Sequence, residues 1–218
     1  MTIQVIYEDN HLVAVFKPAG VLVQGDETGD KCLMDEVKKY LKEKYQKPGN
    51  VFLGMLHRLD RPVSGIVLFA KTSKGASRLS EQFRAHTITK IYTALVEGIP
   101  REKSATLVHY LLKDKNKNIV EVFDKPTTGA LRAELNYQVI KHFNGRALLE
   151  IILKTGRSHQ IRSQLKTIGC PIVGDVKYGG PKWQYPSEIA LCATELAFKL
   201  ATGEETQTIK IEPPESWS

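Results

Sequence analysis

The sequence predicts an α+β fold that forms a single domain over residues 1–218. Segments of strand character dominate the chain. Helical patterns are scattered irregularly among them, without the regular strand–helix alternation that builds a parallel sheet. No internal repeat, low-complexity tract or Pro/Ser-rich linker divides the sequence, and a mixed fold of this length can enclose one core.

The first part of the chain is expected to form three strands and two helices. The first two strands pair and end at a Pro-Gly turn, and the uninterrupted apolar run from Ile66 to Ala70 is typical of a fully buried strand. Apolar residues at helical spacing predict both helices, and Ser73 is the expected N-cap of the second. The expected strands are 3–7, 12–16 and 66–70, and the expected helices are about 33–46 and 74–85.

The later part is expected to return to strands and to add one helix. Ile161, Leu165 and Ile168 recur at i, i+4 and i+7, which predicts a helix that begins near residue 161. This helix is expected to carry Arg162 and Lys166 one turn apart on a shared face. The expected strands are 90–96, 133–139 and 148–153.

Composition indicates a soluble globular protein, with 42% hydrophobic and 25% charged residues. No apolar run approaches the ~18 residues that a membrane span needs, and the first residues do not form a secretory signal. We therefore expect a cytoplasmic protein without a membrane partner. The formal charge of +7 favours a polyanionic partner such as nucleic acid.

Lysines crowd the helix expected at 33–46. Its apolar positions should face the core, and its lysines should face outward, where a solvated surface is the simplest interpretation. The apolar positions are Met34, Val37, Leu41 and Tyr45, and the lysines are 38, 39, 42, 44 and 47.

The cysteines and histidines indicate neither a disulfide framework nor a metal site. Cys32, Cys170 and Cys192 are odd in number and widely spaced, so buried free thiols in a reducing compartment are expected. The six histidines form no pair with metal-ligand spacing. We expect no metal and no cofactor.

An aspartate between two arginines stands directly before the buried strand. The stretch reads His57-Arg58-Leu59-Asp60-Arg61-Pro62-Val63-Ser64-Gly65, which places Asp60 in a loop that a rigid strand positions, as catalytic groups often are. Taken alone, such a triplet is more often an exposed salt-bridge cluster of little energetic weight.

Four segments in order, covering most of the chain, together resemble the RluA-type pseudouridine synthases. They are Tyr7–Asn10 with Lys17–Gly20, His57–Gly65, Lys90–Gly98, and Thr155–Arg162 with Pro171–Asp175. The resemblance implies a central, mostly antiparallel mixed sheet with flanking helices and a central active-site cleft. It also implies that a uridine in structured rRNA or tRNA becomes pseudouridine: the glycosidic bond breaks, the uracil turns, and a carbon–carbon bond to the ribose forms.

The resemblance assigns the chemistry to three residues. Asp60 is the implied nucleophile, attacking either the sugar or the base ring, and this chemistry needs a shielded carboxylate but no cofactor. Arg162 is implied to pair with Asp60, because a nearby guanidinium favours the ionised carboxylate. Tyr92 is implied to pack on the uracil and to remove the C5 proton, although an inward tyrosine on a strand is ordinarily core.

Further residues are implied to bind RNA. Arg58 resembles the residue that fills the gap left when the target nucleotide leaves the stack, and Ile161 resembles one that touches the base. His159 and Gln160 are expected to support the loop before Arg162. The remaining candidate contacts are Arg61, Lys74, Arg78, Arg84 and Lys166.

The sequence departs from the family pattern in two places. The family usually has Asp-Thr where this chain has Pro62-Val63, and often a histidine in place of Cys192. The first change removes a backbone N–H next to the nucleophile and could alter the rigidity of its loop. The pattern also begins at the first strand, without the N-terminal S4 RNA-binding module of many relatives, so RNA selection is expected from this domain alone, on a compact stem-loop.

The sequence leaves two alternative functions to compare with this one. One is an RNA-binding or RNA-folding factor that has kept the scaffold and lost turnover, for which the Pro62-Val63 change is the only hint. The other is a carboxylate hydrolase such as a glycosidase, which needs two cooperating acids, and no second acid accompanies Asp60 in the motifs. An obligatory protein partner is not indicated.

Overall fold

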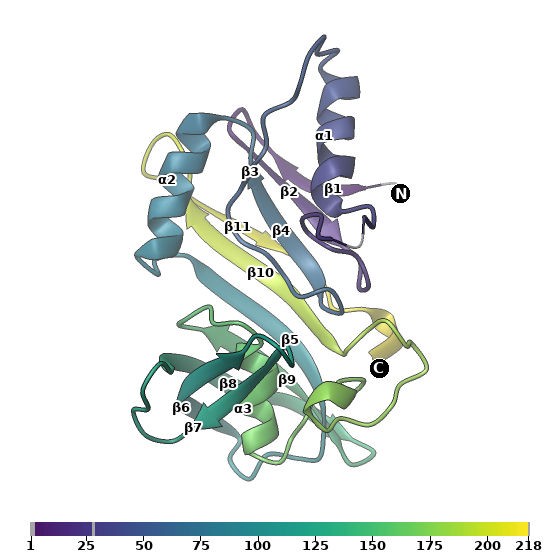
Figure 1. Cartoon of the computed structure of the whole chain (residues 1–218), viewed down its shortest axis with the longest axis vertical. Coiled ribbons are helices and arrows are strands. Elements are labelled where there is room, and N and C mark those ends of the chain that lie inside the picture. Colours follow the sequence, from purple (N-terminus) through teal and green to yellow (C-terminus); the bar gives the residue numbers. More distant parts are fainter. Residues whose placement is uncertain (1–2, 28, 218) are drawn as a thin grey trace. The chain divides into compact units, whose positions relative to one another are not determined.

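The structure is a computed structural model that describes residues 3–27 and 29–217. The chain divides into two compact units, each drawn in Figure 1. The first unit comprises Met1–Ile88 and Glu195–Ile211, and the second comprises Thr89–Thr194 and Glu212–Ser218. That the whole chain forms one domain stays a prediction.

The first unit is built on a sheet with the strand order β1-β2-β4-β10, in which β3 also pairs with β4 and β11 with β10. Every residue of β4 is buried, because its apolar side chains pack on both faces of the sheet. Helix α2 packs on β4 and contributes the fully buried Leu79. The strands are β1 (Gln4–Glu8), β2 (Leu12–Lys17), β3 (Gly54–Met55), β4 (Ser64–Ala70), β10 (Leu191–Lys199) and β11 (Thr206–Lys210), and the helices are α1 (Leu33–Lys44) and α2 (Ser73–Arg84).

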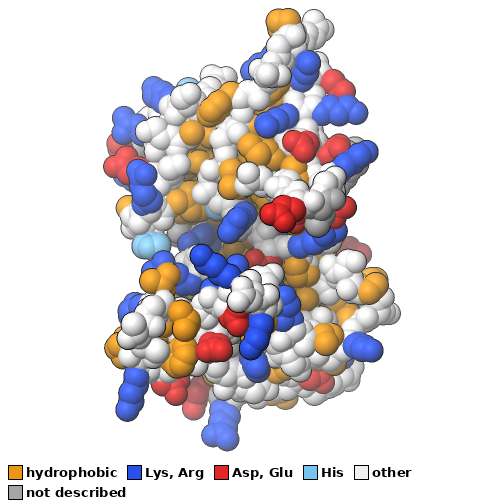
Figure 2. Space-filling model, viewed as in Figure 1, with side chains coloured by type: hydrophobic (Ala, Val, Ile, Leu, Met, Phe, Trp, Pro, Cys, Tyr) orange, Lys and Arg blue, Asp and Glu red, His pale blue; other side chains and the backbone are white. Residues whose placement is uncertain are grey.

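Helix α1 buries Val37 and Leu41, as its pattern predicts, and also Leu33, whereas the predicted Met34 is half-buried. Figure 2 shows Lys and Arg side chains over this helix, and its lysines are exposed except for the half-buried Lys38. Tyr45, expected on the apolar face, is instead 46% exposed. The Lys71 ammonium lies 4.7 Å from the centroid of the Tyr45 ring, and the Tyr45 hydroxyl donates to Glu8 in the polar network described next.

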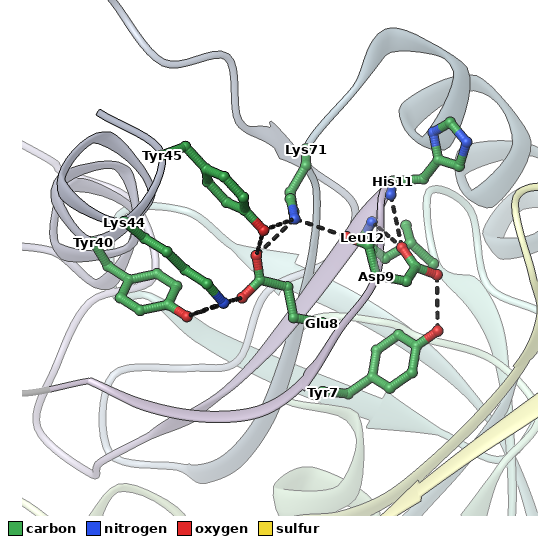
Figure 3. A network of polar contacts seen from close by, with 9 residues as sticks. All are labelled: Tyr7, Glu8, Asp9, His11, Leu12, Tyr40, Lys44, Tyr45 and Lys71. Carbon is green, nitrogen blue, oxygen red and sulfur yellow. Dashed lines mark hydrogen bonds and ion pairs between the residues drawn. The ribbon is translucent and has the colours of Figure 1, made fainter. Parts of the chain in front are cut away.

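The Glu8 carboxylate, at the end of β1, connects this strand to α1 (Figure 3). It accepts hydrogen bonds from the hydroxyls of Tyr40 at 2.9 Å and Tyr45 at 2.6 Å, and from the ammonium groups of Lys44 at 2.7 Å and Lys71 at 2.6 Å. Burial alone would raise the pKa of Glu8, but these four donors outweigh it and lower the pKa from 4.5 to about 2. The network therefore stabilises the ionised carboxylate.

The second unit is built on antiparallel strands in the order β5-β9-β8-β6-β7, with the first half of β10 next to β5. Helix α3 packs on β6 and β7, and its Gln164 side chain donates to the Leu107 carbonyl oxygen of β6 at 3.2 Å. The strands are β5 (Thr89–Glu97), β6 (Ser104–Asp114), β7 (Ile119–Phe123), β8 (Leu131–Phe143) and β9 (Arg146–Leu153). The helices are α3 (Gln160–Thr167) and the short 3-10 turns η1 (Val176–Tyr178) and η2 (Glu215–Trp217).

These elements confirm the predicted α+β class and each predicted strand and helix, with small shifts at the ends. The N-cap of α2 is Thr72, not Ser73, because the Thr72 side chain accepts the Gly75 N–H at 3.1 Å. The patterns do not predict strands β3, β6, β7, β10 and β11. Cys32, Cys170 and Cys192 are free and buried, as expected. Within the described ranges, we find no helix long and apolar enough to cross a membrane.

Candidate active site

Asp60 lies in the loop that connects β3 to β4, at the mouth of the buried strand, and is partly exposed. The Val63 N–H donates to the Asp60 carbonyl oxygen at 3.0 Å, which closes a tight turn directly after the aspartate. The N–H that Pro62 lacks is not part of this bond. The Pro62-Val63 departure is therefore compatible with an ordered loop.

Lys17, the last residue of β2, holds this loop from inside the protein. Its side chain is fully buried. The Nζ atom donates to the carbonyl oxygens of Pro18 at 3.0 Å, Val21 at 2.7 Å and Arg61 at 3.0 Å. An ammonium has three N–H donors, so these acceptors satisfy it completely. The contacts join the turn after β2 to the residue that follows Asp60.

Burial and the Asp60 carboxylate have opposite effects on the pKa of Lys17. Burial lowers the pKa of Lys17 to about 7, and the Asp60 carboxylate opposes this shift. Lys17 belongs to the turn motif Lys17–Gly20, whose pattern alone does not indicate this role. The signal for this role is that a lysine directly follows the apolar run Leu12–Phe16. A cation buried at the end of such a strand needs several acceptors.

The two arginines beside Asp60 differ in their surroundings. The Arg58 side chain is exposed, as expected of a residue that reaches into RNA. Arg61 contacts the protein: its Nε donates to the Gly20 carbonyl oxygen at 3.0 Å and its Nη2 to Asp30 at 2.7 Å. These contacts brace the loop, and so the predicted RNA contact of Arg61 stays a prediction.

His57 also supports the loop. Its Nε2 accepts the Leu68 N–H of β4 at 3.0 Å, which requires that this nitrogen carries no proton. Its ring stacks on Phe83 of α2, with centroids 5.0 Å apart. The histidine thus connects the start of the motif to the centre of the buried strand.

Tyr92 lies on β5 in the second unit and is buried, with 9% of its surface exposed. It stands opposite Ile151 of β9 and on the same face of the sheet as Lys90 and Ala94. Burial lowers the pKa of the Lys90 ammonium. Tyr92 is therefore a buried side chain of a paired strand, which is compatible with both the core and the active-site interpretation.

Arg162, in the first turn of α3, forms a buried ion pair with Asp175. Its Nε and Nη2 donate to the two carboxylate oxygens at 2.7 and 2.9 Å, and both residues are at most 5% exposed. The guanidinium also lies 5.0 Å from the ring centroid of Tyr178. Asp175 was quoted in the family motif but was not recognised as a partner of Arg162.

The loop before Arg162 is fixed by its own side chains, as expected for His159 and Gln160. The Gln160 Oε1 accepts from the Thr155 hydroxyl at 2.8 Å and from the Arg157 N–H at 3.0 Å. His159 has a left-handed backbone, with φ of 49°. Its Nδ1 lies 2.8 Å from the Tyr178 hydroxyl, so this strained residue is held by a specific contact.

The other candidate RNA contacts separate into exposed and buried residues. Lys74, Arg78 and Arg84 are exposed on α2, but Arg84 lies six residues after Arg78 and therefore points about 240° around the helix from it. Lys166 is exposed, whereas Arg162, predicted to share its face, is buried, because the first six residues of α3, 160–165, are all packed in the interior. Ile161 is buried as well, with 4% exposed.

Asp60, Arg58 and Arg61 thus lie in the first unit, and Tyr92, Ile161 and Arg162 lie in the second. Of the groups expected to take part in chemistry, the first unit supplies Asp60 and the second supplies Tyr92 and Arg162. Lys17 braces the loop of Asp60, and Asp175 orients Arg162.

The sequence matches the family model described as RNA pseudouridylate synthase over residues 11–167. It is 36% identical to the ribosomal large subunit pseudouridine synthase C of Buchnera aphidicola, over 81% of this chain and 54% of that protein. It is 34% identical to the tRNA pseudouridine synthase C of Haemophilus ducreyi, over 82% of this chain and 75% of that protein. The chain therefore spans little more than half of the Buchnera protein.

The fold is similar to that of solved human proteins. The human RNA pseudouridylate synthase domain containing 4 superposes with a TM-score of 0.81 and 22% identity, over 98% of this chain and 90% of that one. The human RNA pseudouridylate synthase domain containing 1 gives a TM-score of 0.77 and 22% identity, over 98% and 84%. These similarities confirm the predicted fold class.

Proposed function

Because this chain belongs to the RNA pseudouridylate synthase family, we propose that it isomerises specific uridines in RNA to pseudouridine. The observation that carries the proposal is the loop of Asp60. A carboxylate is placed at the mouth of a buried strand and braced by a buried ammonium whose three donors are all satisfied. Such preorganisation is what a nucleophile requires, since misplacement by 1 Å can slow a reaction about 100-fold.

In this proposal Asp60 is the nucleophile: its carboxylate bonds to the sugar or to the base ring, and this bond breaks again before the product is released. The bond between uracil N1 and ribose C1′ breaks, the detached uracil turns, and C5 bonds to C1′. C5 then loses its proton and N1 gains one, so atoms and electrons balance without an oxidant or reductant. Tyr92 packs on the uracil and receives the C5 proton, as the family pattern implies.

Arg162 orients and stabilises the ionised Asp60 in this proposal. A guanidinium has five N–H donors in one plane, and the two that serve Asp175 fix the direction of that plane. Tyr178 covers one face of the plane. An arginine held in this way keeps its geometry during the reaction, and so it can stabilise developing charge without reorganisation.

The proposed substrate is a stem-loop of rRNA or tRNA. The Buchnera relative is named for ribosomal RNA and the Haemophilus relative for tRNA, and the charge of +7 suits either. Arg58, exposed beside Asp60, would fill the space that the extruded uridine leaves, which offsets part of the cost of unstacking.

The test is tritium release from rRNA and tRNA transcripts that contain [5-³H]uridine. The wild-type chain should release tritium from at least one transcript. Asp60→Asn should abolish release and keep RNA affinity nearly unchanged, because the carboxylate serves chemistry more than binding. Asp124→Asn, at a carboxylate that is 93% exposed, is the matched control and should keep full activity. Binding without release by the wild type on all transcripts would instead favour the catalytically idle RNA-binding factor.

A further inference from the structure

The second unit contains a cavity of about 450 Å³ that the proposed chemistry does not use. It lies between the β8–β9 turn, the segment 183–184 and the 3-10 turn η2. Both tryptophans of the chain line it. The lining residues are Leu95, Phe143, Asn144, Arg146, Trp183, Gln184, Ser216 and Trp217.

The aromatic walls of this cavity are held in place by packing. The ring centroids of Trp183 and Trp217 are 6.4 Å apart, with the planes inclined at 56°, and Trp217 is only 4% exposed. The ring of Tyr185 contacts Trp183 edge-on, with centroids 5.0 Å apart. Trp183 also packs on Gly174, where an added Cβ would lie 3.2 Å from the indole.

The turn that forms another wall is also fixed. Asn144 and Gly145 both have positive φ, at 51° and 76°, as a tight hairpin turn requires. The Gly145 carbonyl oxygen accepts the Gly98 N–H at 2.9 Å. The shape of the cavity is therefore set before any ligand enters.

The polar groups of the cavity suit a nucleotide. Arg146 donates from Nε to Glu97 at 3.0 Å, and no other hydrogen bond of its guanidinium is found among residues 3–27 and 29–217, so its Nη groups can serve a phosphate or a base carbonyl. The Asn144 and Gln184 side chains are exposed at the rim, and amides both donate to and accept from base edges.

We propose that this cavity binds one unpaired base of the RNA, stacked on Trp183, with Arg146 on the adjoining phosphate. The inference rests on the proposed function, and it adds a binding site for a nucleotide other than the reacting uridine. Splayed bases on aromatic side chains are the usual mode of single-strand recognition, and the volume lies in the range of small-ligand sites. Arg146 and the amides favour this occupant over an apolar peptide.

The experiment uses the intrinsic fluorescence of the full chain, because its two tryptophans both line the cavity. We expect a short oligouridylate to quench this fluorescence with saturation. An abasic ribose-phosphate oligomer of equal length and charge should not. Equal quenching by both oligomers would overturn the proposal, because it would mean binding by charge alone. The absence of quenching by either oligomer would overturn it as well.

Two variants and one control sharpen this test. Trp183→Leu removes the stacking face and keeps apolar packing, and Arg146→Gln removes the charge and leaves both indoles in place. Each should weaken oligouridylate binding by about fivefold or more. Arg132→Gln is the matched control, because Arg132 is also paired with a glutamate, Glu134, but lies outside the cavity. An unchanged affinity in Arg146→Gln and a folded Trp183→Leu would contradict the proposal.

Turnover measurements separate this inference from the proposed function. On the RNA that the wild type modifies, both variants should raise KM and keep the single-turnover rate at saturating RNA. If oligouridylate quenches the fluorescence of the wild type but the wild type forms no pseudouridine, the proposed function fails and the cavity remains a base site. If it forms pseudouridine with no base-dependent quenching, only the cavity proposal fails.

Discussion

The Nζ atom of Lys17 lies 3.0 Å from the carbonyl oxygen of Arg61, the residue directly after Asp60. Because the same nitrogen also serves Pro18 and Val21, one buried charge sets the path of two loops. The position of the candidate nucleophile thus depends on a side chain that starts on a different strand.

Lys17→Met should lower both stability and activity. The substitution keeps the side-chain volume but leaves three carbonyl oxygens without the donor they share in the fold, which should lower the free energy of unfolding by about 2–4 kcal/mol. The rate of tritium release in a single turnover should fall about tenfold or more, because the loop of Asp60 loses its brace.

Urea denaturation and single-turnover assays check this prediction. Lys210→Met, at an exposed lysine of β11, is the matched control and should change neither quantity. A Lys17→Met variant with wild-type stability and rate would mean that the three contacts do not hold the loop.

Arg162→Lys should slow the reaction with little change in RNA affinity. Lysine keeps the charge but cannot reproduce the planar pair of hydrogen bonds to Asp175. If Arg162 orients Asp60, the single-turnover rate at saturating RNA should fall by one or more orders of magnitude, roughly 1.4 kcal/mol for each tenfold.

A different result is expected if Arg162 contacts an RNA phosphate and does not orient Asp60. In that case Arg162→Lys would keep the saturated rate, and Arg162→Ala would only weaken binding. Arg132→Lys, at an exposed ion pair in the same unit, controls for the loss of a guanidinium as such. Asp175→Asn should resemble Arg162→Lys, because it removes the charge that orients the arginine.

The first unit should become less stable in acid, because the stabilisation that the ionised Glu8 carboxylate provides is lost there. Its pKa of about 2 in the fold lies below its ordinary 4.5, so its contribution is fully present above pH 4.5 and is lost as the pH falls toward 2. Glu8→Gln should therefore lower the free energy of unfolding at pH 7, by up to about 3 kcal/mol. The difference between variant and wild type should shrink in acid.

Urea denaturation at pH 7 and at a pH near 2 measures this difference. Glu121→Gln, at an exposed residue of β7, should show none at either pH. A Glu8→Gln penalty that is the same at both pH values would mean that the network acts through packing, and not through the ionised carboxylate.

RNA binding should weaken as salt is added. For looped RNA the slope of log K against log salt should be about −0.7 for each phosphate that the protein neutralises. Removing one charge by Lys74→Gln, Arg78→Gln, Arg84→Gln or Lys166→Gln should flatten the slope by about that amount if the residue contacts a phosphate. Lys113→Gln, on β6, is the control, and a slope near zero in the wild type would make the basic composition a matter of solubility.

Much of the fold could be predicted from local patterns. The apolar run of β4 and the spacing of Val37 and Leu41 in α1 are determined by burial over a few residues. Strand β6 lacks this signal: its burial is intermittent, and besides the neighbouring β7 it pairs with β8, which begins 17 residues after β6 ends. Non-local pairing of this kind leaves little trace in a short window of sequence.

The candidate site could be predicted in part. Motif order indicated Asp60, Tyr92 and Arg162, and their roles stay proposals. The partners that hold these groups were missed. Lys17 meets an acceptor 44 residues away, and Arg162 meets Asp175 across 13 residues. A sequence pattern shows that a charge is present, but only the folded backbone shows which carbonyl oxygens or carboxylates neutralise it.

The division of the chain into units bears on how the protein is made. The second unit is nearly one continuous run, Thr89–Thr194, whereas the first also needs Glu195–Ile211. During synthesis the middle of the chain can therefore fold while the opening segment still waits for β11. Closing the first unit then joins segments more than 100 residues apart, which is a slow kind of contact to form. The first unit therefore stays incomplete until Glu195–Ile211 have been made, although most of its residues precede the second unit in the sequence.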